Sequence, residues 1–175
     1  MKNKEAILRK VEWSLMAEFG LVSTTNTTLR RFSDELMNEL GIVPTVYERN
    51  AESQRVMKNK LKKKNQFCEQ HKFKCEDYRL VFIPVNENTI ELFTIKTYEN
   101  RKGKGTEVLN RILDVCDRLN ISLKLDPFGF INGEHNPSYD RWLKGWYKSF
   151  GFVDIPFDRF GGLIYKPEQN LQMAA

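Results

Sequence analysis

Residues 89–120 read TIELFTIKTYENRKGKGTEVLNRILDVCDRLN, and this stretch predicts the fold of the second half of the chain. Residues 89–97 are rich in β-branched and aromatic side chains, which suit a strand with one buried face. From Thr106 onward, apolar residues recur at the spacing of an amphipathic helix. The sequence therefore predicts a strand, a short basic loop containing Gly103 and Gly105, and a helix, in that order.

The loop at Gly103 and Gly105 is suited to binding an anion. Glycine adopts backbone conformations that are closed to other residues, and it lets a ligand approach the main chain. The helix that follows offers unpaired backbone N–H groups and the positive end of its dipole. Arg101, Lys102 and Lys104 add positive side chains at the same place. We therefore expect a phosphate-binding loop.

Two common phosphate-binding motifs fit this loop less well. A P-loop needs a glycine where Tyr98 stands, and its Gly-Lys-Ser/Thr order is interrupted by Gly105. A dinucleotide-binding fingerprint needs a third glycine where Val108 stands. Asp126 lies about where that fingerprint has its acidic residue, so this second alternative stays open.

Two segments resemble the GNAT superfamily of acetyl-CoA-dependent N-acetyltransferases. Residues 100–105, NRKGKG, resemble its pyrophosphate loop, Gln/Arg-x-x-Gly-x-Gly/Ala, with Asn100 where the family usually has Gln or Arg. Residues 146–152, WYKSFGF, resemble its late helix ending, Tyr-x-x-x-Gly-Phe. The two segments occur in the order of the family, with one strand-like segment between them. The resemblance extends over about residues 78–166.

The resemblance implies a GNAT-like α/β fold, in which a mixed, mostly antiparallel sheet is flanked by helices. Residues 1–175 would form one domain, with a mainly helical, divergent portion at 1–77 and a coenzyme-binding core at 78–166. The implied cofactor is acetyl-CoA, held through loop amides at its pyrophosphate and through a strand edge at its pantetheine arm. The residues implied in coenzyme binding are Thr94, Ile95, Asn100, Arg101, Lys102, Gly103, Lys104, Gly105 and Thr106.

The implied reaction is direct acetyl transfer to an amine acceptor, whose identity the sequence leaves open. No covalent enzyme intermediate is needed, because the site holds the two substrates together and manages protons. By resemblance, Tyr147 protonates the departing thiolate. A phenol has a reference pKa of about 10, so it is neutral at pH 7 and can donate a proton. The alternative is that Tyr147 belongs to a packed aromatic helix face.

An acceptor amine arrives protonated, so a base must remove its proton before attack. Glu91 is the candidate base, because it lies on the strand before the loop and shares a strand face with Phe93 and Ile95. The alternative for Glu91 is a solvated strand carboxylate. Asp126, His135 and Asp140, in or beside a long turn-rich loop, are further candidates, and the sequence does not choose among them.

The rest of the chain alternates helices and strands. If the segment before residue 72 is helical, Cys68, His71 and Cys75 share one face at zinc-like spacing, with Glu69 or Glu76 as a possible fourth ligand. A second Cys/His pair is lacking, so no metal site is expected. The expected elements are helices at 4–19, 29–40, 50–71 and 138–150, the last capped by Ser138, and strands at 42–47, 78–85, 89–97, 121–125, 152–155 and 162–165.

The composition indicates the class of protein and its compartment. The chain of 175 residues is 41% hydrophobic and 29% charged, as expected of a globular domain, and it lacks an apolar run of membrane-spanning length. Three cysteines without framework spacing indicate a reducing compartment, so we expect a cytoplasmic protein.

The chain carries a net charge of +5, which favours acidic partners. The lysine run at 58–64 is either a solvated helix face or a nucleic-acid contact. A homodimer also stays open. The alternative to an enzyme is a non-catalytic GNAT-fold module that binds a protein or a nucleic acid.

Overall fold

A computed structural model of the chain describes residues 24–50, 67–98, 103–131 and 133–167. In this part of the chain a seven-stranded sheet has the strand order β1-β2-β3-β4-β5-β9-β8, and β6 and β7 form a separate hairpin. The elements are α2 (Thr24–Leu40), β1 (Thr45–Asn50), β2 (Phe67–Lys74), β3 (Tyr78–Asn86), β4 (Thr89–Thr97), α4 (Lys104–Leu119), β5 (Ser122–Leu125), β6 (Phe130–Ile131), β7 (Glu134–His135), α5 (Pro137–Lys148), β8 (Val153–Asp154) and β9 (Leu163–Tyr165).

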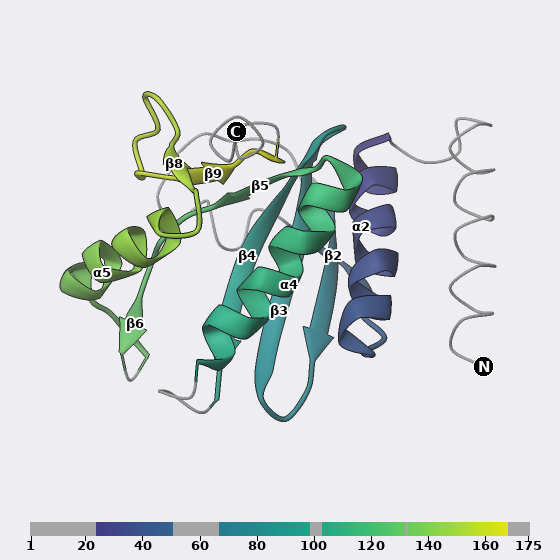
Figure 1. Cartoon of the computed structure of the whole chain (residues 1–175), viewed down its shortest axis with the longest axis horizontal. Coiled ribbons are helices and arrows are strands. Elements are labelled where there is room, and N and C mark those ends of the chain that lie inside the picture. Colours follow the sequence, from purple (N-terminus) through teal and green to yellow (C-terminus); the bar gives the residue numbers. More distant parts are fainter. Residues whose placement is uncertain (1–23, 51–66, 99–102, 132, 168–175) are drawn as a thin grey trace.

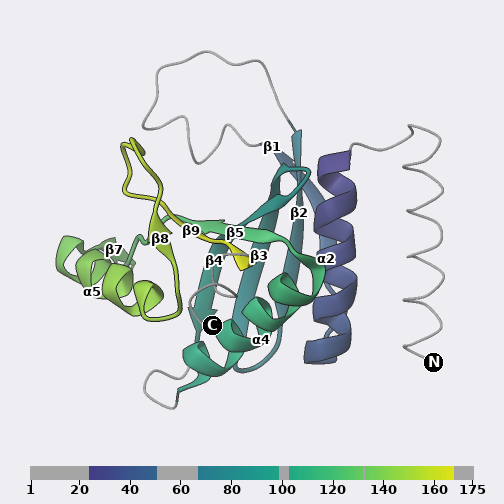
Figure 2. The ribbon, with the colours of Figure 1, turned by 45° about the horizontal axis from the view of Figure 1, so that its top comes forward.

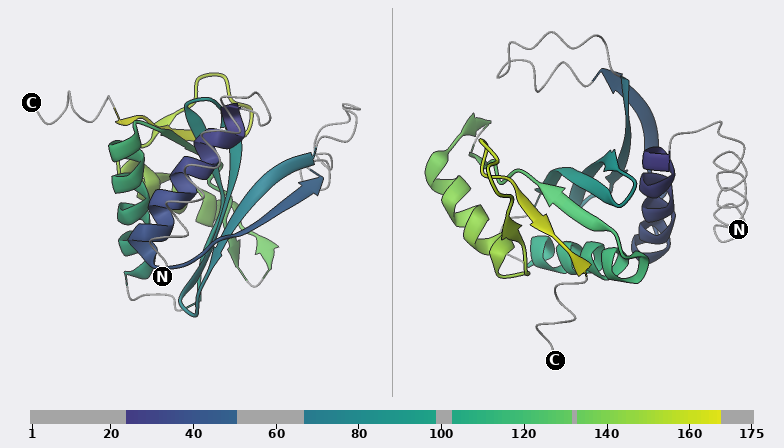
Figure 3. Two further views of the ribbon diagram at one scale, coloured as in Figure 1. Left: turned by 90° about the vertical axis from the view of Figure 1, so that its right-hand side faces the viewer. Right: turned by 90° about the horizontal axis from the view of Figure 1, so that it is seen from above.

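The predicted mixed, mostly antiparallel sheet is confirmed. Of the strand pairs in the described residues, only β4 and β5 run parallel, and α4 is the connection between them. The helices α2 and α4 lie side by side on one face of the sheet (Figures 1 and 3), whereas α5 lies at the opposite end of the molecule from α2 (Figure 2). The chain therefore has the expected α/β fold, a mixed sheet flanked by helices. That it forms one domain stays a prediction.

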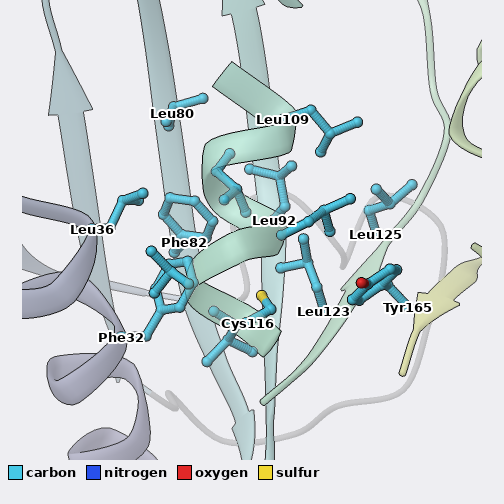
Figure 4. Packing of buried hydrophobic residues seen from close by; sticks show 14 of the residues in the cluster. Phe32, Leu36, Leu80, Phe82, Leu92, Leu109, Cys116, Leu123, Leu125 and Tyr165 are labelled. Carbon is cyan, nitrogen blue, oxygen red and sulfur yellow. The ribbon is translucent and has the colours of Figure 1, made fainter. Parts of the chain in front are cut away.

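The core lies between the two helices and the sheet. Phe32 of α2 contacts Phe82 of β3 edge-on, with ring centroids 4.9 Å apart. From α4, the apolar stripe that the sequence predicted is buried, including Cys116, whose thiol pKa is raised by burial. Figure 4 shows these side chains converging with Leu92 of β4 and Leu123 of β5. Each such side chain contributes about 1.5–3 kcal/mol when fully buried.

The helix boundaries follow ordinary capping chemistry. The N–H of Gly41, at a φ of 67°, bonds to the carbonyl of Met37 and ends α2 at the predicted place. The N-cap of α5 lies two residues before the predicted one, because the side chain of Asn136 accepts hydrogen bonds from the N–H groups of Ser138 and Tyr139. Ser138 is therefore not the cap.

One predicted element is wrong where the structure describes it. Residues 67–71, predicted as the end of a helix, are part of strand β2. The sequence lacks the alternation of apolar and polar residues that marks a strand, because two of the buried positions that face α2 are polar, Glu69 and His71. The predicted helix at 4–19 and the lysine run at 58–64 lie outside the described residues.

A buried polar network joins β2 to α2. His71 Nδ1 lies 2.6 Å from Ser33 Oγ, and His71 Nε2 lies 2.7 Å from Glu69 Oε1. Glu69 also accepts two hydrogen bonds from Arg30, at 2.9 and 2.7 Å. Burial acts to raise the pKa of Glu69, but the hydrogen bonds from His71 and Arg30, together with their charges, lower it to about 2. The imidazole that the sequence considered as a zinc ligand thus packs α2 onto the sheet.

Candidate functional site

The strands β4 and β5 diverge after a short parallel start. Their pairing covers Thr89 to Glu91 on β4 and ends opposite Lys124 of β5. Beyond Glu91, β4 continues to Thr97, paired with β3 but with no further strand partner on the β5 side among the described residues. The edge of β4 is therefore open to an extended ligand that can exchange hydrogen bonds with backbone groups.

A β-bulge in β4 stands where the divergence begins. Thr94 pairs with Val81, but Leu92 pairs with Phe82, so Phe93 is an extra residue. A bulge bends the strand and increases its twist, which accounts for the separation from β5. The bulge also reverses the predicted faces. Glu91 now shares a face with Thr94, and Ile95 points to the other face, so that part of the sequence interpretation is wrong.

The first turn of α4 faces this open edge without a side-chain cap. Gly103 is the N-cap residue, with a φ of 70°, and no side chain bonds to the free N–H groups after it. Lys104 Nζ lies 3.2 Å from Glu107 Oε2 and 3.7 Å from Asp77 Oδ2. The hydrogen bond and charge of Glu107, with Asp77, raise the pKa of Lys104. Asn100, Arg101 and Lys102 lie outside the described residues.

The protein's own packing does not require a glycine at 105. A β-carbon there would lie 3.7 Å from the indole of Trp146 and 3.9 Å from Thr97 Cγ2, which are ordinary contacts, and its φ is not positive. Glycine in a helix interior costs about 1 kcal/mol relative to alanine. A glycine that packing does not need favours close approach of a ligand to the backbone. The same contacts show that α4, α5 and the end of β4 meet at Gly105.

Tyr147, the predicted proton donor, is a core residue. It is 4% exposed, and its ring lies 4.8 Å from that of Trp146 and 5.6 Å from that of Phe152. Burial raises the pKa of its phenol, and Tyr139 raises it further, so Tyr147 stays protonated at neutral pH. The ring of Tyr147 therefore belongs to a packed aromatic helix face, and the catalytic role of its hydroxyl stays a prediction.

Glu91, the predicted base, is 3% exposed and sits opposite Ile83 of β3 and Lys124 of β5. The alternative of a solvated strand carboxylate is therefore wrong. Its role as a base stays a prediction.

Two of the other candidate bases lie together. His135 Nε2 is 2.6 Å from Asp140 Oδ2, and the N–H of Gly129 donates to the other oxygen of Asp140. Asp126 lies apart from this pair, with its Oδ1 buried and without a hydrogen-bond partner among the described residues. Its carboxylate lies beside Gly162, where a β-carbon would stand only 2.9 Å from Oδ1.

The described residues contain no group of three or more His, Cys, Asp and Glu side chains placed to hold a metal ion. In the same part of the chain, each helix is too short or too polar to cross a bilayer.

No protein-family model matches the chain, and no curated protein matches it. Three solved structures are similar in fold. The anti-CRISPR protein AcrVA5 is 15% identical, over 55% of this chain and 98% of its own, with a TM-score of 0.46. A GNAT family acetyltransferase from Elizabethkingia anophelis with acetyl-CoA bound is 14% identical, over 70% and 97%, with a TM-score of 0.39. AtaTR bound with AcCoA is 10% identical, over 75% and 98%, with a TM-score of 0.38. At these sequence identities and TM-scores, the similarity concerns the arrangement of the backbone alone.

Proposed function

We propose that the protein is a divergent GNAT acetyltransferase that transfers an acetyl group directly from acetyl-CoA to an amine. The observation that carries this proposal is the junction at Gly105, where an uncapped helix N-terminus, a glycine without a packing role and the unpaired edge of β4 come together. Each of the three features suits one part of the coenzyme: an anion at the N–H groups, close approach at the glycine, and a pantetheine arm along the strand.

The proposed binding residues divide between two elements. The N–H groups at Lys104, Gly105 and Thr106 would bond to the diphosphate, because the first turn of a helix leaves its donors unpaired. Thr94 and Ile95 would exchange backbone hydrogen bonds with the amides of the pantetheine arm. When bound, acetyl-CoA supplies an activated acetyl group. The flanking residues Asn100, Arg101 and Lys102 remain part of the prediction.

Tyr147 has a more specific role in this proposal than a simple proton source. A phenol whose pKa is raised by burial gives up its proton less readily than a free phenol. It can still donate a hydrogen bond to the sulfur as negative charge develops there, in a site that excludes water. We therefore assign to Tyr147 the stabilisation of the leaving thiolate.

Calorimetric titration with acetyl-CoA tests the proposal, because the chain offers a matched pair of helical glycines. Gly105→Ala adds a methyl group at the proposed diphosphate site, while Gly145→Ala adds one on the open surface of α5, with nothing within 4 Å. Each change is expected to stabilise the fold by about 1 kcal/mol. We expect Gly105→Ala to weaken acetyl-CoA binding about ten-fold or more, and Gly145→Ala to leave it unchanged. Equal affinity in both variants would contradict the proposal.

The rival function is a GNAT-fold module that binds a partner without turnover. Thioester consumption with a panel of amines separates the two, because a module binds the coenzyme or the partner and consumes nothing. Nucleic-acid binding through the lysines at 58–64, a homodimer and a cytoplasmic location stay predictions.

A further inference from the structure

His135 and Asp140 form an oriented imidazole–carboxylate pair at the surface. An ionised carboxylate only accepts hydrogen bonds, so the 2.6 Å contact assigns the proton of a neutral imidazole to Nε2. The N–H of Gly129 holds the second oxygen of Asp140, which fixes the carboxylate at both ends. Nδ1 then carries a free lone pair on a side chain that is 42% exposed. This is the arrangement by which a carboxylate orients a histidine as a base.

The pair is surrounded by aromatic rings. Phe128 and Phe130 lie 5.8 and 5.9 Å from the imidazole, measured between ring centroids. Phe130 is 62% exposed, which is unusual for such a large apolar side chain. Exposed rings beside a carboxylate suit a ligand with a positive charge and an apolar body.

The pair also lies on the same helix as Tyr147. Asp140 and Tyr147 are seven positions apart in α5, so they lie on one side of the helix, about 10 Å apart along its axis. Helical side chains lean towards the N-terminus, which brings the Tyr147 hydroxyl closer to Asp140. A base at the amine and a donor at the sulfur need a separation of this order, because hydrogen bonds of about 3 Å lie on each side of the reacting atoms.

We propose that His135, oriented by Asp140, is the base that deprotonates the acceptor, and that the acceptor is a primary amine on an apolar or aromatic body held against Phe130. This inference rests on the proposed acetyl transfer. The ammonium group gives one proton to Nδ1, and the free amine forms the C–N bond as the C–S bond breaks. The second nitrogen proton ends on the departing sulfur, giving an amide and a thiol, and the imidazolium returns its proton to water.

His135→Gln is the discriminating variant, because glutamine keeps an N–H donor for Asp140 but cannot take up a proton at neutral pH. The charged groups at the imidazole are Asp140 from α5 and the neighbouring Glu134 on β7, while Phe128 and Phe130 bring no charge. We expect wild-type kcat for 2-phenylethylamine to rise with pH, because the base must be unprotonated to take the proton of the amine. In His135→Gln this rise disappears and kcat falls about 100-fold, with unchanged affinity for acetyl-CoA. A variant that keeps the wild-type rate and pH profile would overturn the assignment of the base.

The proposed class of acceptor is tested by comparing two amines as substrates. We expect 2-phenylethylamine to be acetylated with kcat/KM about ten-fold or more above that of ethylamine. Phe130→Ala should reduce this preference, whereas Phe157→Ala, at a fully exposed residue on the β8–β9 connection, should not. Equal use of the two amines would overturn the acceptor assignment. A wild-type protein that binds no acetyl-CoA would instead reject the proposed function, and this inference with it.

Discussion

Trp146 of α5 packs across Gly105 at the first turn of α4: the nearest indole atoms lie 3.7 Å from the position of a β-carbon on Gly105. A ligand at the backbone of Gly105 would lie beside this indole, and we expect its arrival to change the environment of the indole.

Tryptophan emission is expected to report coenzyme binding through Trp146. The chain has three tryptophans, of which Trp142 is 58% exposed and stacks on Trp146, with ring centroids 6.2 Å apart. We expect acetyl-CoA to change the emission of the wild type and of Trp142→Phe. Trp146→Phe should lose most of the change. A signal that survives in Trp146→Phe and vanishes in Trp142→Phe would place the ligand elsewhere.

Tyr147→Phe should separate catalysis from binding. The ring stays packed against Trp146 and Phe152, so the free energy of unfolding is expected to stay within about 1 kcal/mol of wild type. Without the hydroxyl, the leaving thiolate loses a hydrogen bond, and we expect kcat to fall about 100-fold with little change in the affinity for acetyl-CoA. Steady-state kinetics and calorimetry measure the two quantities. An unchanged kcat would remove Tyr147 from the mechanism.

The buried network around Glu69 should make folding sensitive to acid. The pKa of Glu69 is lowered from an ordinary 4.5 to about 2, so folding favours its ionised form. This stabilisation is fully present above about pH 4.5 and is lost as the pH falls towards 2, because the unfolded chain takes up the proton first. Its size is at most about 3 kcal/mol. Urea unfolding at a series of pH values measures it.

The Glu69→Gln variant is the control for urea unfolding as a function of pH. The variant should be less stable than wild type at pH 7 by about 2–4 kcal/mol, because Arg30 and His71 lose their carboxylate. The stability difference between the two proteins should shrink as the pH falls from 5 to 2. A difference that stays constant over this range would show that Glu69 is not the titrating group.

Packing between α2 and the sheet can be tested with a pair of phenylalanines. Phe32 is fully buried against Phe82, whereas Phe157 is fully exposed. Phe32→Ala is expected to lower the free energy of unfolding by about 3–5 kcal/mol, and Phe157→Ala by less than about 0.5 kcal/mol. Chemical denaturation measures both. Similar losses would contradict the description of the core.

The periodic segments of this fold could be predicted from the sequence. The stripe of Val108, Leu109 and Ile112 in α4 reflects burial on one face, which short-range patterns record well. Strands β3 and β4 could be predicted from their β-branched and aromatic residues, although residues 80–82 and 90–92 are buried on both strand faces. The order of strand, loop and helix could be predicted for the same reason, but Gly105, which was predicted in the loop, lies in the first turn of α4, which begins at Lys104.

Long-range contacts determine the features that could not be predicted from the sequence. Strand β2 was hidden because Glu69 and His71 are buried through partners on α2, which lie far away in the chain. The bulge at Phe93 depends on the register with β3, so the faces of Glu91 and Ile95 could not be read from β4 alone. The pairing of His135 with Asp140 was equally invisible, because it depends on how the β6–β7 hairpin meets α5.

The most direct test of coenzyme binding at the α4 N-terminus is an amide NMR titration of the wild-type protein with acetyl-CoA. The account predicts saturable shifts that are largest at the N–H groups of Lys104, Gly105 and Thr106 and along the unpaired half of β4. Shifts that do not saturate, or that are largest far from Gly105, would contradict it.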